Sequence, residues 1–299
     1  MALRCKPNQR RIISVRALMA TPHPPSRSNK GAHERLRRVE GRHNALVKEM
    51  RRAFSRAELT ETGDCAIEGV RILEEAIRSG LRFRAVFFSE SAEGHAQRLL
   101  PQIGAHVETA VLPDKLFATV VPSETPQGVA ALVRYKQSSF ADVIERVSLG
   151  PLVVVVGLQD PGNLGTILRS SEAFGAAGLL LGEGTVSPFN AKVVRGSAGS
   201  IFRVPLVRVK LAEILPQLRE KAVRLAATSS HTGVPLPEAD LAGRLGVLIG
   251  GEGAGISKDV MAKVDEVLAI PHTPQVESLN AGVAASIVLY EIARRKLER

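Results

Sequence analysis

A continuous apolar run, LVVVVG at residues 152–157, constrains the fold of this 299-residue chain more than any other segment. A strand with one solvated face alternates between apolar and polar residues, whereas an uninterrupted run rich in valine suits a strand that is buried on both faces. Strands of that kind occur in parallel sheets that carry helices on both sides. The run therefore predicts an α/β unit that begins at Pro151 and is built on an open parallel sheet.

Polar or glycine-rich loops follow three of the expected strands in this unit. The loop DPGN (160–163) follows the first strand, GGEGAG (250–255) follows a second, and PHTPQVESLN (271–280) follows a third. Ligands of open α/β sheets bind beyond the carboxyl ends of the strands, so these loops mark the expected site. The glycine loop matches neither the dinucleotide fingerprint nor the P-loop signature. We expect Asn163 to be the N-cap of the helix that follows the first loop.

The closing helix carries more polar residues at its start than a helix start requires. Leu279, Val283 and Ile287 recur at helical spacing, and Ser278 just before them is the expected N-cap. The partner position of a capping box is occupied by Ala281, which has no side chain that can reach back. Capping therefore leaves Glu277 and Asn280 unexplained, and it raises the question of why an amide stands in the first turn.

The residues before Pro151 predict a smaller α/β domain. We expect helices within 43–56, 65–80 and 95–104, and strands within 83–90, 105–112 and 128–135. The sequence shows no catalytic group in this domain, which we interpret as a binding module. The predicted organisation is an arm at 1–42, a binding domain at 43–135, a linker at 136–150 and a second domain at 151–299.

The charge of the chain is concentrated at its N-terminus. Residues 1–42 hold eleven Lys and Arg against Glu34 and Glu40, which gives +9 of the net +10. A basic, Pro- and Ser-containing arm is expected to be disordered and to bind phosphate backbones. Two alternatives stay open: a mitochondrial transit peptide, or an untranslated segment if translation starts at Met19. The expected location is the cytoplasm, with the mitochondrial matrix as the alternative if the basic N-terminus is a transit peptide.

Composition excludes several classes of protein. The two cysteines, Cys5 and Cys65, are too few for a disulfide framework or a zinc site, so we expect a reducing compartment and no metal. No apolar run approaches the roughly 20 residues that span a bilayer, so we expect no membrane.

The motifs of the second unit resemble a known family. DPGNLGTILRSSEAFG, VVRGSAGSIFRVPL, and VLIGGEGAGIS with LAIPHTPQVESLNAGVAASIVLYE look like the three successive motifs of the SpoU (TrmH) RNA 2'-O-methyltransferases, of the SPOUT superfamily. The first domain, with NALVKEMRR, IEGVRILEEAI and TPQGVAALVR, is similar to the ribosomal-protein-like RNA-binding domain of many members. The resemblance implies an α/β fold whose parallel sheet is tied in a deep trefoil knot, with S-adenosylmethionine (AdoMet) as cofactor and structured RNA as substrate.

The resemblance also assigns roles to residues. The cofactor-binding positions of the family fall on Gly250, Ile270 and Leu279. The polar catalytic set falls on Asn163, Arg169, Glu252, Ser278 and Asn280. Arg169 takes the position closest to the reacting hydroxyl. A guanidinium holds its proton firmly, so Arg169 acts either as an unusual base or as a clamp for phosphate and the developing alkoxide.

Three kinds of function are compatible with these residues: ribose methylation of RNA, RNA binding without activity on the same fold, and chemistry on a small molecule. The complete polar set argues against the second, and the extra domain with its basic arm argues against the third. Ribosomal RNA is the expected target, with transfer RNA as the alternative. The resemblance further implies a homodimer that pairs through the knotted domain.

Overall fold

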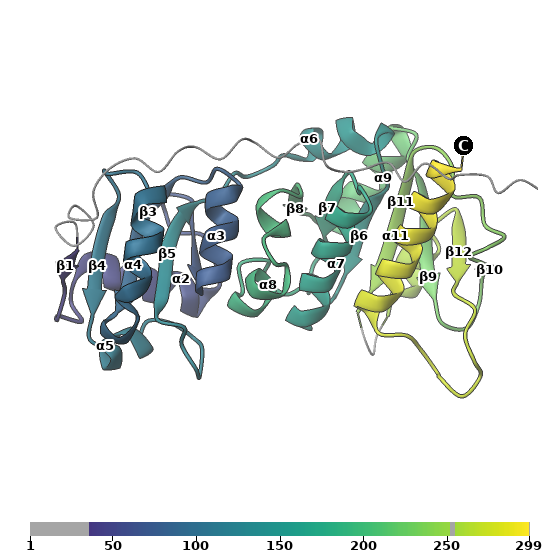
Figure 1. Cartoon of the computed structure of the whole chain (residues 1–299). Coiled ribbons are helices and arrows are strands. Elements are labelled where there is room, and N and C mark those ends of the chain that lie inside the picture. The colour runs from purple at the N-terminus through teal and green to yellow at the C-terminus, as the bar shows by residue number, and fades with distance from the viewer. Residues whose placement is uncertain (1–35, 252–254, 299) are drawn as a thin grey trace, which may run out of the picture.

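Two α/β units lie next to each other in the computed structural model, which describes residues 36–251 and 255–298. Figure 1 shows the N-terminal unit in purple and blue beside the C-terminal unit in green to yellow. The predicted arm lies mostly in residues 1–35, outside the described residues, and its role stays a prediction. Within the described part of the chain, every helix is too short or too polar to cross a lipid bilayer.

The C-terminal unit is built on a seven-stranded sheet in the order β10-β12-β9-β11-β6-β7-β8, and all of its strand pairs are parallel. Its strands are β6 (Leu152–Val156), β7 (Gly178–Leu181), β8 (Leu206–Arg208), β9 (Arg224–Ser229), β10 (Val234–Pro235), β11 (Leu245–Gly250) and β12 (Glu266–Ala269). The apolar run that forms β6 is buried along its whole length. The predicted doubly covered parallel strand is confirmed.

Helices cover both faces of this sheet. One face carries α7 (Pro161–Ala173), α8 (Ala191–Gly196) and α11 (Ala281–Leu297), and the other carries α6 (Phe140–Glu145), α9 (Leu211–Glu220) and α10 (Lys258–Met261). Alternate residues of β6 serve the two faces: Val153 and Val155 join the first cluster, and Leu152 and Val154 join the second. The predicted α/β fold is confirmed, whereas the trefoil knot stays a prediction.

The segment that we predicted as a linker, 136–150, packs as part of the C-terminal unit. Helix α6 and the 3-10 turn Arg146–Ser148 lie in this segment. Val143, Ile144 and Val147 are buried in the same apolar cluster as Leu152. These three apolar side chains are removed from water by packing on the sheet, so the stretch is a component of the fold.

The N-terminal unit has a mixed five-stranded sheet in the order β1-β4-β3-β5-β2. Its elements are β1 (Arg37–Arg38), α2 (Ala45–Arg56), β2 (Asp64–Glu68), α3 (Val70–Arg78), β3 (Phe83–Ser89), α4 (Gly94–Leu99), β4 (Glu108–Leu112), α5 (Asp114–Ala118) and β5 (Val129–Arg134). Short 3-10 turns at Glu90–Ala92 and Leu100–Gln102 flank α4.

Two expectations for this unit differ from the structure. Arg37 and Arg38, expected in the arm, form β1 and pair with β4, so the ordered sheet starts before residue 43. Residues 65–68, expected at the start of a helix, belong to β2, and the helix begins only at Val70. Gly69, at φ 102°, turns the chain between them, a backbone conformation that glycine adopts readily. All five residues of β2 are buried, which explains why no alternation was visible in the sequence.

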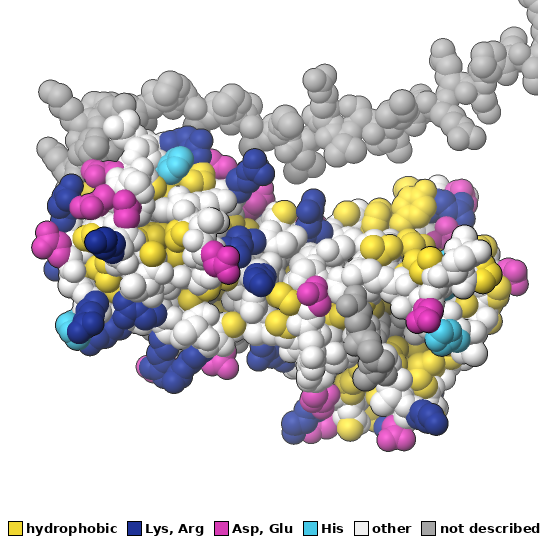
Figure 2. Space-filling model, turned by 90° about the horizontal axis from the view of Figure 1, so that it is seen from below, with side chains coloured by type: hydrophobic (Ala, Val, Ile, Leu, Met, Phe, Trp, Pro, Cys, Tyr) yellow, Lys and Arg dark blue, Asp and Glu magenta, His cyan; other side chains and the backbone are white. Residues whose placement is uncertain are grey.

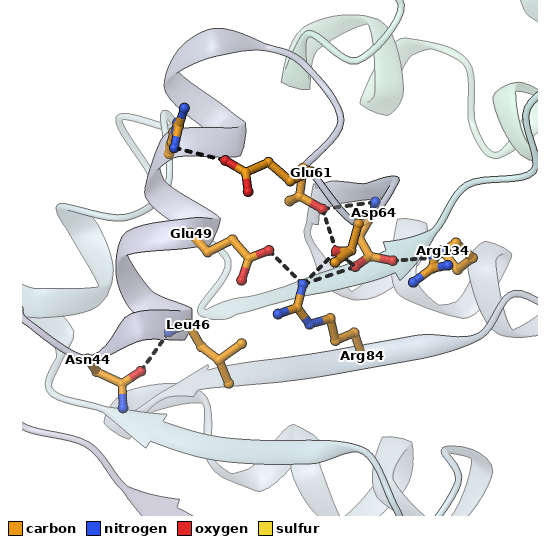
Figure 3. A network of polar contacts seen from close by, with 10 residues as sticks. Asn44, Leu46, Glu49, Glu61, Asp64, Arg84 and Arg134 are labelled. Carbon is orange, nitrogen blue, oxygen red and sulfur yellow. Dashed lines mark hydrogen bonds and ion pairs between the residues drawn. The ribbon is translucent and has the colours of Figure 1, made fainter.

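A buried carboxylate joins three strands and a loop of the N-terminal unit. Asp64 on β2 accepts hydrogen bonds from Arg134 Nε (2.7 Å), Arg84 Nη1 (3.2 Å) and Thr62 Oγ1 (2.6 Å). Figure 3 shows the two arginines pointing at Asp64 from β5 and β3, with Glu49 of α2 on the far side of Arg84. Burial raises the pKa of Asp64, but the hydrogen bonds from Thr62 and the two arginines outweigh it and hold the pKa below its ordinary value.

We predict that Asp64→Asn lowers the free energy of unfolding by about 3 kcal/mol at neutral pH, because it leaves two guanidinium groups without their buried partner. The folded pKa is depressed, so the stabilisation is present above the ordinary carboxyl pKa of 3.8 and is lost as pH falls through the lower folded value. Urea unfolding across this range measures it, and the difference between Asp64→Asn and the unaltered protein should shrink with acidity.

The matched control is Glu61→Gln, which removes an ion pair whose carboxylate side chain is 89% exposed. We expect its effect to stay within about 0.5 kcal/mol. Equal losses in the two variants would contradict the assigned role of Asp64.

Candidate cofactor pocket and active site

A cavity of about 350 Å³ opens at the carboxyl edge of the parallel sheet. Its lining comes from the ends of β9 and β11 with the loops that follow them (residues 228–231, 249–251 and 255–256), from the loop after β12 (270–279), and from the start of α11. Parallel strands end at one edge, so loops that are far apart in sequence meet there. The sequence analysis expected a site at this edge.

Four of the residues that we singled out line this cavity. They are Gly250, Ile270, Ser278 and Leu279. Leu279 is half-buried and Ser278 is exposed. The cavity thus contains every position that the resemblance assigns to the cofactor and one of the positions assigned to catalysis. The role of each residue in the reaction stays a prediction.

The glycine loop after β11 is pressed against the end of β6. The Gly251 N–H donates to the Val156 carbonyl (2.9 Å), and Gly251 and Gly255 form an isolated bridge. A Cβ at Gly251 would collide with the Gly157 carbonyl oxygen. Glycine is therefore required here by close backbone approach. Glu252, predicted as a catalytic residue, lies outside the described residues.

Asn163 is not the N-cap of α7, contrary to our expectation. Asp160 holds that position, and its Oδ1 accepts a hydrogen bond from the Asn163 N–H at 2.7 Å. Pro161 occupies the first helical position, where a missing N–H costs nothing, and this was a signal that the sequence offered. Asn163 is 6% exposed and faces α11: a Cβ on Gly282 would lie 3.3 Å from its Oδ1.

Ser278 is not the N-cap of α11, which is a second correction. Asn280 is the cap, and its Oδ1 accepts a hydrogen bond from the Val283 N–H at 3.2 Å. Capping therefore does account for the amide that the sequence analysis had left without a structural role. Ser278, two residues earlier, is free to line the cavity.

Helices α7 and α11 run in parallel and in contact (Figure 1). Ser170 and Ser286 share a hydrogen bond of 2.6 Å, and further along the rings of Phe174 and Tyr290 meet edge to face with centroids 5.7 Å apart. Both helices therefore begin at the edge that bears the cavity. Their N-termini bring the positive ends of two helix dipoles to this edge, which favours negative charge there.

Arg169 lies on the exposed side of α7 and is not among the residues that line the cavity. Within residues 36–251 and 255–298, its guanidinium forms no hydrogen bond or ion pair. A cation without an acidic partner in the described structure is available to an anionic ligand. Of the predicted catalytic set, the structure brings Asn163 and Asn280 to the starts of adjacent helices, and it leaves Arg169 more than a helical turn further along α7.

The sequence analysis missed the loop after β9. Residues 228–231 supply three hydroxyl groups and His231 to the cavity. An apolar stretch that runs into the polar tetrad TSSH was the available signal, but we did not recognise β9 as a strand. His272 was also missed; its Nδ1 lies 2.6 Å from the Ile270 carbonyl oxygen. Among the described residues, no group of three or more His, Cys, Asp or Glu side chains could hold a metal ion.

The sequence was compared with models of known families. Residues 150–290 match the SpoU rRNA Methylase family, and residues 44–131 match the MRM3-like substrate binding domain. The 23S rRNA (guanosine(2553)-2'-O)-methyltransferase RlmP of Bacillus subtilis is 30% identical over 257 residues, which is 86% of this chain and 99% of RlmP. The chain belongs to the SpoU rRNA methylase family.

Solved structures of this family agree with the fold. The SpoU methyltransferase AviRb of Streptomyces viridochromogenes, solved in complex with AdoMet, aligns with a TM-score of 0.74 and 26% identity over 85% of this chain and 99% of AviRb. The AdoMet-bound rRNA methyltransferase of Sinorhizobium meliloti aligns with a TM-score of 0.73 and 25% identity over 88% of this chain and 99% of that protein. The predicted family is confirmed. Its members are AdoMet-dependent RNA methyltransferases, and so is this SpoU methylase.

The cavity of this SpoU methylase suits AdoMet in size and chemistry. Its volume of about 350 Å³ lies within the range of small-molecule sites, roughly 300–1,000 Å³. Ile249, Ile256 and Leu279 are apolar lining residues that would suit a purine, and Thr228 and Ser229 carry hydroxyl groups. Backbone groups of the three loops supply donors and acceptors at fixed positions.

We predict that Leu279→Asp abolishes measurable AdoMet binding, because it places a carboxylate against an apolar wall. Isothermal titration calorimetry with AdoMet measures the effect. The matched control is Leu297→Asp on the same helix, where the side chain is 88% exposed and should tolerate the charge. Wild-type affinity in Leu279→Asp would remove this residue from the cofactor site.

Proposed function

We propose that this SpoU methylase transfers the methyl group of AdoMet to a ribose 2'-hydroxyl in ribosomal RNA. The observation that carries the proposal is the cavity of about 350 Å³ at the carboxyl edge of the sheet, bounded by the start of α11 and adjoining the start of α7. The curated relative RlmP, whose name gives a 2'-O position in 23S rRNA, supports this choice of RNA and of atom.

The N-terminal unit is proposed to bind the RNA substrate. Lys48, Arg52 and Arg56 recur at every fourth residue of α2, and all three are exposed. Figure 2, which views the molecule from below, shows Lys and Arg side chains spread over the N-terminal unit on the left and fewer over the C-terminal unit. Such side chains bind RNA mainly through phosphate groups, which gives affinity without sequence information.

The reaction places specific demands on the residues around the cavity. AdoMet supplies a methyl group that is activated by its sulfonium sulfur. The ribose oxygen must be aligned with that methyl group. As the new O–C bond forms, the S–C bond breaks and leaves a neutral thioether, and the hydroxyl proton passes to solvent water. We assign the alignment to Ser278 and to the amide of Asn280, which lie at the start of α11 beside Leu279. Asn163, buried beneath them at the start of α7, is proposed to fix their position.

Arg169 is proposed to bind the phosphate next to the reacting ribose and to stabilise the developing alkoxide. Its exposure, and the lack of an acidic partner within the described residues, support this role over that of a base. The positive ends of α7 and α11 act in the same direction, because both helices begin at this edge.

We predict that Arg169→Ala lowers the rate of methyl transfer by about a hundredfold or more, because it removes the charge that stabilises the alkoxide. Arg169→Lys should retain part of the rate, since it keeps the charge but loses the planar guanidinium that can bind phosphate through two hydrogen bonds. Transfer of tritiated methyl from AdoMet to ribosomal RNA measures the rate, with transfer RNA as the parallel substrate. Arg208→Ala, which removes another exposed arginine of this unit, is the control and should stay within a few fold.

Asn280→Ser separates the two roles of this residue. Serine caps a helix about as well as asparagine, so the stability of α11 should be kept while the amide is lost. We predict a loss of methyl transfer of about a hundredfold with AdoMet affinity unchanged. Asn44→Ser, the same change at the N-cap of α2, is the control. Full activity in Asn280→Ser would limit Asn280 to capping.

The SpoU methylase is further proposed to form a homodimer through α11. Val283 and Tyr290 on this helix are 46% and 53% exposed, which is unusual for large apolar side chains on one helix. A second copy of the same face would cover them.

We predict that Val283→Arg converts the dimer to a monomer, because it introduces a charge into the buried face. Sedimentation equilibrium should give twice the chain mass of 32.0 kDa for the unaltered protein and 32.0 kDa for the variant. Leu149→Arg, at a side chain that is 66% exposed on another part of the unit, should remain dimeric. A monomeric unaltered protein at micromolar concentration would refute the dimer.

A further inference from the structure

Residues 187–203, hereafter the connecting segment, contain most of the second sequence motif (193–206) and lie between the two units. Among the described residues, none of the segment 187–203 lines the AdoMet cavity. Ser187 Oγ instead donates a hydrogen bond to the Ala57 carbonyl of the N-terminal unit at 2.5 Å. The ring of Phe189 meets that of Tyr135 edge to face, with centroids 4.9 Å apart. The start of the connecting segment is therefore docked on the N-terminal unit.

Arg195 of the connecting segment reaches a buried acid of the N-terminal unit. Its Nη1 donates to Glu68 Oε2 at 3.3 Å and also to Ser123 Oγ. Ser123 in turn donates to the same Glu68 oxygen at 2.8 Å. The Glu68 side chain is only 2% exposed, so this contact is shielded from solvent on the side of the acid.

Arg203, at the other end of the connecting segment, contacts both units at once. Its Nη1 donates to Glu75 Oε2 (3.1 Å) and to Ser79 Oγ (2.8 Å) on the N-terminal unit. Its Nε and Nη2 form a bidentate pair with Glu172 of α7, with Nη2 to Oε2 at 3.0 Å. The hydrogen bond from Arg203 lowers the pKa of Glu172, as expected of a well-formed ion pair.

Glycines let the connecting segment approach both neighbours closely. A Cβ on Gly165 of α7 would lie 2.9 Å from the Gly196 Cα, so α7 and α8 meet backbone to backbone. Gly199, at φ 90°, lies against Glu75: a Cβ added to Gly199 would lie 2.7 Å from the Glu75 Cβ. The segment is thus held between α3 and α7 with no room for larger residues at these two contacts.

We propose that Arg203 is a positioning residue that fixes the orientation of the RNA-binding unit relative to α7, the helix that bears Asn163 and Arg169. The inference rests on the proposed function for its effect on RNA, and on the contacts alone for its effect on orientation. One guanidinium joins Glu75 and Ser79 on one side to Glu172 on the other. An RNA that is bound by both units then meets two surfaces at a fixed separation.

Loss of this link should act on RNA capture more than on the chemical step. An RNA that is bound to one unit meets the surface of the other unit at a high effective concentration when the two units are held at a fixed separation. Loosening the link between the units lowers that concentration. Helix α7 keeps its own contacts with α11 through Ser170 and Phe174, so the catalytic residues should stay in place. The cofactor cavity is built from other loops and should be unaffected.

Steady-state methyl transfer with the full-length protein tests the effect on RNA. For Arg203→Met we expect KM for RNA to rise about tenfold, kcat to stay within about threefold, and AdoMet affinity to be unchanged. Arg203→Lys should be intermediate, because lysine keeps the charge and loses the bidentate geometry. Glu75→Gln should reproduce part of the loss, and the double variant Glu75→Gln/Arg203→Met should be no worse than Arg203→Met alone.

The control is Arg219→Met, which breaks an ion pair with Asp265 inside the C-terminal unit (3.4 Å). It should leave KM and kcat within about twofold of the unaltered values. An unchanged KM in Arg203→Met, an equal loss in Arg219→Met, or additive losses in the double variant would each overturn the proposal.

A distance measurement tests orientation without any RNA, so it distinguishes failure of this inference from failure of the proposed function. Spin labels are placed by Lys115→Cys and Lys221→Cys, two exposed positions on different units, with Cys5→Ser to remove the other reactive thiol. Cys65 is buried, so it should stay unlabelled. In dimers diluted with unlabelled chains, electron-electron double resonance should give a narrow distance distribution that broadens in Arg203→Met and not in Arg219→Met. The same distribution in Arg203→Met and the unaltered protein would overturn the proposal.

Discussion

The close contact between α7 and α11 is the constraint on which the rest of the structure depends. Gly282 allows it, because a Cβ there would lie 3.0 Å from the Thr166 Cβ and 3.3 Å from Asn163 Oδ1. The two helices run in parallel, so their N-termini and the polar residues at their starts reach the same edge of the sheet. Helix α11 then provides one wall of the cavity. The opposite side of α7 receives the connecting segment through Gly165, so α11 and α7 together lie between the cavity and the contacts to the N-terminal unit.

Local sequence patterns predicted the elements whose burial is uniform or periodic. The valine run gave β6, and loops rich in glycine or polar residues marked two of the three strand ends that form the cavity. The helix caps were predicted less well. Ser278 and Asn280 both have capping side chains, and the choice between them depends on where the chain turns into α11, which tertiary packing decides. For α7, Pro161 favours Asp160 over Asn163, because proline prefers the first helical position.

Other features could not be read from the sequence, because they depend on how the two units dock. Arg195 is an isolated basic residue in the sequence, yet in the structure it pairs with Glu68, 127 residues earlier in the chain. Strand β2 lacks an alternating pattern since all of its residues are buried, and residues 65–68 were therefore assigned to a helix. The glycines of the second motif show the same limit, because the partners that they approach closely, Gly165 and Glu75, are visible only in the folded chain.

The central claim is that this SpoU methylase modifies a ribose 2'-oxygen, and the most direct measurement is the alkaline hydrolysis pattern of RNA after incubation with the protein and AdoMet. A 2'-O-methyl group blocks attack of that oxygen on the neighbouring phosphate, so the modified nucleotide leaves a gap in the hydrolysis ladder. The account predicts a gap at one nucleotide of ribosomal RNA that requires AdoMet. An uninterrupted ladder from RNA that has nevertheless taken up the methyl group would contradict it, because the methyl group would then lie on a base.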